Sequence, residues 1–211
     1  MDFETLQLLR KDAWSAYNAG RLPSVVELLD AYLKRRTDDG FMWFLYGDSL
    51  RIMGMMSAAR DALRTALRHA PRRRRYRVQG TLGKLYSEWG KRALAEKYYS
   101  RATQARNGGS ELAWIWQLRG VNLAKMEEFH GSCTCLKFAT ELDNEDPDVF
   151  HSLGAVLCAL KQYADSIVAL DRAIALRGGD FPAALKLRNS MAGIAEVIDR
   201  IATIEYGNGS S

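Results

Sequence analysis

Residues 43–71 read WFLYGDSLRIMGMMSAARDALRTALRHAP, two runs in which apolar residues recur every three or four positions. That period predicts two amphipathic helices. Gly54 stands between the runs, where a residue without Cβ can take the left-handed conformation that ends a helix. Pro71 prevents the second helix from continuing. Small residues inside the runs predict that the two helices cross closely; they are Gly47, Ala59 and Ala66.

The same pattern returns along the chain at intervals of 34 to 37 residues. The small residue of the first helix recurs as Gly47, Gly83, Gly120 and Gly154, each followed nineteen residues later by an alanine. The turn position recurs as Gly20, Gly54, Gly90, Glu127 and Lys161. A period of this size is the signature of stacked repeats, because one hairpin alone cannot bury its apolar face.

These positions resemble the signature of the tetratricopeptide repeat family, a helix–turn–helix repeat of about 34 residues. The best match is in the second repeat, at Trp43, Tyr46, Gly47, Ala59, Ala66 and Pro71. The resemblance implies an all-α fold, a right-handed α-solenoid of about five helical hairpins plus a C-terminal capping helix. We expect the hairpins at about 6–39, 40–73, 76–109, 113–146 and 147–180, the capping helix at 181–205 and a flexible tail at 206–211.

The last predicted helix has two interpretations. Its apolar residues alternate at spacings of four and three, as Leu187, Met191, Ile194, Ile198 and Ile201. Such a stripe suits a helix that caps the array by docking on the fifth hairpin. The same spacing is that of a coiled-coil seam, through which two copies of the chain would form a homodimer.

Composition places the chain among ordinary folded proteins and separates it into regions of opposite charge. Hydrophobic residues make up 47% of the 211 residues, and no apolar run is long enough to span a membrane. The acidic start and the odd number of cysteines, three, favour a cytoplasmic protein without disulfides. Between Arg60 and Arg106 there are 14 Lys or Arg and three acids, whereas Glu111–Asp180 holds six bases and 11 acids. Such a separation influences how partners are encountered.

The resemblance also implies a binding groove, because the first helices of successive repeats line the concave surface of tetratricopeptide proteins. Aromatic residues mixed with Arg and Lys, the types that dominate binding hot spots, fall at those positions. We therefore expect a protein–protein interaction module or scaffold that binds a partner peptide or acidic segment in its groove. The expected groove residues are Arg10, Trp14, Tyr17, Phe44, Asp48, Arg51, Arg77, Lys84, Trp114, Gln117 and His151. A chaperone-tail adaptor is not expected, because Asp48 stands where such adaptors carry an asparagine and would repel a carboxylate.

A cluster of arginines precedes the third hairpin, at Arg68, Arg72, Arg73, Arg74 and Arg75, and continues to Arg77. Cations at a helix N-terminus oppose the helix dipole, so a local cost is expected there. The cluster is either a patch that binds an anion or serves in targeting, or a solvated loop between hairpins.

No catalytic or metal-binding pattern is present in the sequence, and we expect neither enzyme activity nor a cofactor. The three histidines, His69, His130 and His151, fall in different repeats. Cys133 and Cys135 stand two positions apart on a predicted helix and therefore point to different sides; we expect buried thiols. Two other functions stay open: a chaperone for secreted or assembly-bound clients, and nucleic-acid binding through the basic middle.

Overall fold

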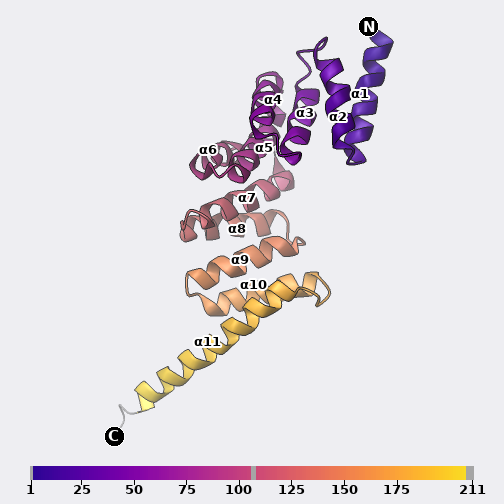
Figure 1. Cartoon of the computed structure of the whole chain (residues 1–211). Coiled ribbons are helices and arrows are strands. Elements are labelled where there is room, and N and C mark those ends of the chain that lie inside the picture. Colours follow the sequence, from indigo (N-terminus) through magenta and orange to yellow (C-terminus); the bar gives the residue numbers. More distant parts are fainter. Residues whose placement is uncertain (1, 106–107, 208–211) are drawn as a thin grey trace. The chain divides into compact units, whose positions relative to one another are not determined.

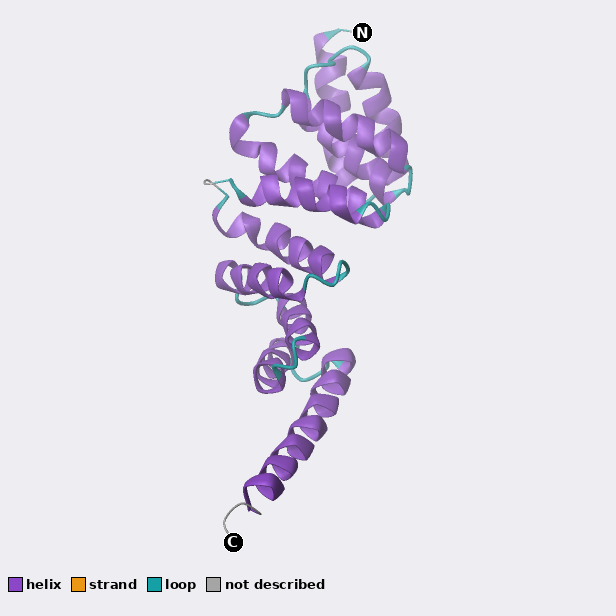
Figure 2. Ribbon diagram, turned by 90° about the vertical axis from the view of Figure 1, so that its left-hand side faces the viewer, coloured by secondary structure: helices purple, strands orange, loops and turns teal. Residues whose placement is uncertain are grey.

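The structure is a computed structural model that describes residues 2–105 and 108–207. Within these ranges the chain forms helices joined by short turns and loops, and no strand (Figure 1, Figure 2). The expected all-α solenoid fold is confirmed. The chain divides into two compact units, unit 1 at residues 1–108 and unit 2 at residues 109–211.

Unit 1 consists of successive helical hairpins. We call the first helix of each hairpin the A helix and the second the B helix. Each A helix packs against its own B helix, and α1, α3 and α5 also contact one another in sequence. The hairpins are α1 (Phe3–Asn18) with α2 (Leu22–Leu33), α3 (Gly40–Ile52) with α4 (Met56–His69), and α5 (Arg75–Glu88) with α6 (Arg92–Thr103), and the 3₁₀ turn η1 (Arg72–Arg74) precedes α5.

Unit 2 repeats this arrangement and adds one more helix. Its elements are the 3₁₀ turn η2 (Gly109–Leu112), α7 (Ala113–Ala124), α8 (Phe129–Leu142), α9 (Pro147–Ala159), α10 (Tyr163–Leu176) and α11 (Pro182–Gly207). The last helix packs on both α10 and α9, which is the position that the A helix of a further hairpin would take. Met191 is buried and Leu187 packs against the core formed with Phe181 and Ala184, as expected for a capping helix.

The other interpretation of α11, a homodimer seam, stays a prediction. Ile194 is 39% exposed. The side chains of Ile198 and Ile201 lie outside the described residues, as does the end of the expected tail at 208–211.

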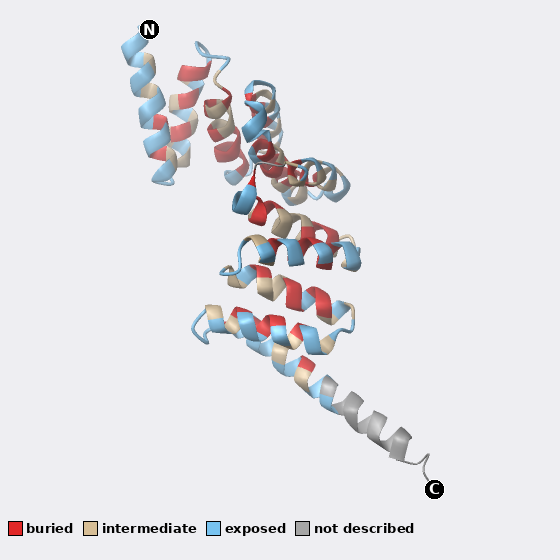
Figure 3. Ribbon diagram, turned by 180° about the vertical axis from the view of Figure 1, so that it is seen from behind, coloured by how far each residue is buried: buried red, intermediate tan, exposed pale blue. Residues whose placement is uncertain are grey.

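Glycine makes room for a buried side chain at each hairpin crossing. A Cβ added to Gly83 would lie 2.6 Å from the ring of Tyr99, and one added to Gly154 would lie 2.6 Å from Leu170. Gly47 and Gly120 stand in the same relation to Leu63 and Leu136, at 2.7 Å. The predicted close crossing is therefore confirmed. The nearest neighbour of the glycine is a leucine or tyrosine of the B helix, and the alanine three positions after that residue is itself buried. Figure 3 shows buried segments in the hairpins of both units.

The turns inside the hairpins share one backbone conformation. The turn residue has a positive φ in every hairpin, between 60° and 78°, at Gly20, Gly54, Gly90, Glu127 and Lys161. The following amide donates to the carbonyl five residues earlier, for example Met55 to Leu50 and Gln162 to Leu157. This bond satisfies a carbonyl at the end of each A helix. The turn is thus preserved in unit 2 although no glycine occupies it.

Candidate functional site

Two hollows lie on the A-helix face of unit 1, on either side of Phe41. One hollow lies between α1 and α3, where Arg10, Lys11 and Trp14 face Phe41. The other lies where the N-terminal ends of α3 and α5 meet. We refer to these as the first and the second hollow.

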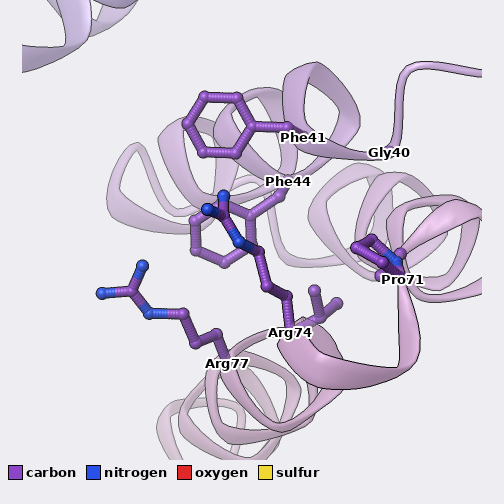
Figure 4. A pocket seen from close by; sticks show the side chains of 8 residues that line it. Gly40, Phe41, Phe44, Pro71, Arg74 and Arg77 are labelled. Atoms are coloured by element: carbon purple, nitrogen blue, oxygen red, sulfur yellow. The ribbon is translucent and has the colours of Figure 1, made fainter. Parts of the chain in front are cut away.

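The second hollow has apolar walls and a cationic edge. Phe41 and Phe44 of α3 form one wall, and Pro71 and Val78 contribute from the other side. Arg74 of η1 and Arg77 of α5 complete the lining, and Figure 4 shows the Arg74 side chain reaching toward the Phe44 ring. The hollow has a cavity volume of about 50 Å³, far below the range for small-molecule sites, roughly 300–1,000 Å³. Its chemistry suits an apolar side chain next to an anionic group.

The first hollow carries the most accessible aromatic residue of the expected groove. Trp14 is 44% exposed. Its ring lies 5.3 Å from that of Phe41 and is stacked on Tyr17 at 6.3 Å, measured between centroids. These contacts hold a large apolar surface in place at the protein's exterior, which is the property of a binding anchor.

Three of the expected groove residues instead form a polar chain across the A helices of unit 1. The Tyr17 hydroxyl donates to Asp48 Oδ2 at 2.6 Å, and Arg51 Nε donates to Asp48 Oδ1 at 2.8 Å. Arg51 Nη1 also donates to both carboxylate oxygens of Glu88, at 2.8 and 2.9 Å. Asp48 and Arg51 are each only 8% exposed, and burial, with the hydrogen bond to Asp48, raises the pKa of Tyr17. Asp48 and Arg51 therefore bind each other, and Arg51 also binds Glu88. This series of polar contacts joins α1, α3 and α5.

Asp39 organises the edge of the first hollow and was not singled out from the sequence. Its side chain caps α3 by accepting from the amides of Phe41 and Met42. The same carboxylate accepts from Arg10 Nε at 3.1 Å and from the Tyr32 hydroxyl at 3.0 Å. An aspartate immediately before an apolar run is a helix-cap signal that could have identified it.

The arginine cluster does not form one surface. Arg68 donates to Thr65 on α4, and Arg75 Nε donates to the carbonyl of Ala70 at 3.2 Å. Arg74 lines the second hollow, while Arg72 is exposed in η1. Because Arg72–Arg74 form a separate 3₁₀ turn, α5 begins only at Arg75, without a side-chain cap. The cluster therefore divides between the hollow, the end of α4 and the solvent.

The remaining expected residues lie elsewhere. Lys84 is half-buried on α5. Trp114 and Gln117 on α7 and His151 on α9 belong to unit 2 and are half-buried; the His151 ring lies 5.0 Å from that of Phe181. Their role in binding stays a prediction.

The three cysteines form no disulfide, and Cys133 and Cys135 are buried, as expected. In the described part of the chain, no group of three or more His, Cys, Asp or Glu residues is arranged to hold a metal ion. Among the described helices, none combines the length and apolar composition needed to cross a membrane.

One hairpin of the chain also matches a known protein family by sequence. The model of the tetratricopeptide repeat matches residues 76–108, the hairpin of α5 and α6. This hairpin is a tetratricopeptide repeat. No curated protein sequence matches the chain. Its fold is shared with solved structures at low sequence identity.

PilF of Pseudomonas aeruginosa is similar with a TM-score of 0.79 and 17% identity, over 98% of this chain and 90% of PilF. YrrB is described as a tetratricopeptide protein with an unusual peptide-binding site. It is similar with a TM-score of 0.66 and 20% identity, over 84% of this chain and 88% of YrrB. MamA of Desulfovibrio magneticus RS-1 is similar with a TM-score of 0.71 and 16% identity, over 84% of this chain and 98% of MamA. At these identities the likeness shows that the chain shares their fold.

Proposed function

We propose that the chain is a protein-interaction module whose A-helix face in unit 1 binds a peptide segment with apolar and acidic side chains. The fold supports a general protein-binding role. The finer assignment rests on the second hollow, in which Phe41 and Phe44 offer apolar walls beside Arg74 and Arg77.

The arrangement assigns separate tasks to the two kinds of residue. An apolar side chain of the peptide enters between Phe44 and Val78 and removes its surface from water, the main source of affinity. A neighbouring carboxylate meets Arg74 and Arg77, which fix its position and select acidic sequences. Trp14 supplies a second apolar contact on the far side of Phe41. Arg51, held by Asp48 and Glu88, supports the face from beneath rather than contacting the peptide.

Charge around the site favours encounter with an acidic partner. Residues 60–106 carry 14 Lys or Arg and three acids. Attraction between exposed charges is screened over about 8 Å at physiological ionic strength, so affinity should fall as salt is added. A purely apolar interaction would show little such dependence.

The experiment is a selection from a random peptide display library on the purified full chain, followed by affinity measurements on the enriched peptides. We expect peptides that combine apolar with acidic residues. Reversing the hollow's charges with Arg74→Glu and Arg77→Glu should weaken their binding by about tenfold or more. The matched control is Arg64→Glu with Arg68→Glu, which makes the same change on α4, outside both hollows.

The control variant should bind within about twofold of the parent, because rim charges away from a contact act mainly on encounter rate. Equal loss in both variants would show a general charge effect and contradict the assignment to the hollow. Peptides that bind the Arg74→Glu, Arg77→Glu variant as tightly as the parent would place the binding surface outside the second hollow.

A further inference from the structure

Unit 2 has an apolar groove between its B helices, on the side formed by α8 and α10. The floor is Phe150 and Leu157 of α9, and Val168 of α10 forms part of one wall. Lys137 borders it from α8, and Asp165 and Arg172 border it from α10. We call this the B-helix groove; its cavity volume is about 540 Å³, too large for one side chain.

The repeat provides an internal reference for this groove, because the same place exists in unit 1. There Tyr98 of α6 stands at the position of Ala169, and Tyr86 of α5 at the position of Leu157, counted from Gly83 and Gly154. The two tyrosine rings stack at 5.3 Å with an angle of 18°. A hollow of similar size remains beside Tyr98, but charged and polar side chains line it, among them Asp61, Arg64 and Thr65. In unit 2 the lining is mostly apolar.

The most exposed residues beside the groove also differ between the two units. Val168 is 69% exposed and Phe138 is 45% exposed, whereas the equivalent residues of unit 1 are Lys97 and Thr65. Phe138 stands next to Lys137 on α8 and packs its ring on Trp116 at 5.0 Å. At these exposed positions, unit 2 thus carries apolar side chains where unit 1 carries polar ones. Contiguous exposed apolar surface of this kind marks interaction sites.

The dimensions and charges of the groove indicate what occupies it. Its walls, α8 and α10, are 14 residues each, about 21 Å at 1.5 Å per residue. Lys137 lies level with Arg172, because one repeat of 34 residues carries it to the neighbouring position 171. Asp165 lies two turns earlier on α10. The groove is therefore apolar in its centre, cationic at one end and anionic at the other.

We infer that the B-helix groove of unit 2 binds an amphipathic helix of a partner protein, about four turns long. Aliphatic side chains at i, i+4, i+7 and i+11 of that helix lie on Phe150 and Val168. An acidic residue of the helix pairs with Lys137 and Arg172, and a basic residue two turns away pairs with Asp165. This surface is separate from the one in the proposed function and does not depend on it.

The test measures binding of a fluorescent helical peptide to the full chain by anisotropy. The probe is an Ala-based peptide of about 18 residues with leucines at i, i+4, i+7 and i+11, and with a Lys two turns before a Glu beside the leucine stripe. A peptide of the same composition with the leucines distributed around the helix, and one with Lys and Glu exchanged, are the reference probes. We expect saturable binding of the first peptide, and weaker binding of both others.

Two variants install the residues of unit 1 in the groove. Val168→Lys should weaken binding by about tenfold or more, because it places a charge on the exposed apolar wall. Phe138→Thr should also weaken binding, because it removes an exposed ring beside Lys137. Lys97→Val in unit 1 is the control and should create no second site, since charged and polar side chains line the equivalent hollow.

Equal binding of all three peptides, or full binding by Val168→Lys, would overturn the inference. No saturable binding of the striped peptide would overturn it as well. A parent that is dimeric in sedimentation and becomes monomeric on Val168→Lys would assign the groove to a second copy of the chain, which contradicts a partner helix.

Discussion

Units 1 and 2 build the same hairpins with different polar chemistry. In unit 1 a buried chain of Tyr17, Asp48, Arg51 and Glu88 links three A helices. In unit 2 the buried polar contacts are local: Ser132 and Ser166 each donate to the carbonyl of the crossing glycine of their own hairpin at 2.7 Å. Unit 1 has alanines, Ala59 and Ala95, at the equivalent positions.

This difference shows which features belong to the repeat and which to the surfaces. The crossing glycine and the positive-φ turn occur in both units, since every hairpin needs them to pack. The ionic chain and the hollows beside Phe41 belong to unit 1. The groove beside Val168 differs from its counterpart in unit 1 by its apolar lining.

The largest expected effect follows from breaking the ionic chain of unit 1. Arg51→Met leaves Asp48 buried without its cation, which should lower the free energy of unfolding by about 3–5 kcal/mol. Arg188→Met in unit 2 removes an exposed pair with Asp171 and should cost less than about 1 kcal/mol. Urea unfolding of both variants gives the comparison, and equal losses would show that Arg51 is not a buried structural charge.

The second prediction concerns the crossing that both units share. Gly154→Ala forces a methyl group to within 2.6 Å of Leu170 and should cost about 1–3 kcal/mol. Gly193→Ala is the control in α11, where nothing lies within 4 Å, and should stabilise by about 0.5–1 kcal/mol. Thermal melts measure both, and a stable Gly154→Ala would contradict the helix pairing.

The serine contact of unit 2 should have a smaller effect. Ser166→Ala removes the buried hydroxyl bonded to Gly154 and should cost about 0.5–1.5 kcal/mol. Ser152→Ala removes a hydroxyl bond near the surface, to Asp148, and should be close to neutral. If both variants unfold at the same denaturant concentration, burial does not strengthen the contact.

The smallest expected effect is at the turns. Glu127 and Lys161 hold a φ of 62° and 60°, a conformation that costs side-chain-bearing residues about 1–2 kcal/mol. Glycine should therefore raise stability, by about 1 kcal/mol or less after its larger chain entropy is counted. Calorimetry on Glu127→Gly and Lys161→Gly checks that stability rises. Gly90→Ala in unit 1 should lower stability instead.

The periodic parts of the molecule could be predicted from sequence because packing repeats with the hairpin. Gly83 and Gly154 occupy the same position of the repeat, so their role at the helix crossing could be predicted from their spacing alone. The turn residues Glu127 and Lys161 were found the same way, although neither residue favours the conformation it adopts.

The site was less predictable, because its contacts join residues from different hairpins. Arg51 was expected to face a partner, but its pairing with Glu88 depends on the register between α3 and α5, which spacing within one repeat does not give. The role of Arg74 in the second hollow depends on a 3₁₀ turn that four successive arginines do not reveal. The B-helix groove depends on apolar residues such as Val168, which stand where unit 1 has charged or polar ones, and only a residue-by-residue comparison of repeats reveals it.

The most direct test of peptide binding on the A-helix face is to map a selected peptide on the isotope-labelled chain by amide chemical shifts. Binding as proposed should shift the amides of Phe41, Phe44, Arg74, Arg77 and Val78 most strongly. It should leave those around Gly154 and Ser166 unchanged. Shifts concentrated in unit 2, or none above noise at saturating peptide, would contradict the assignment.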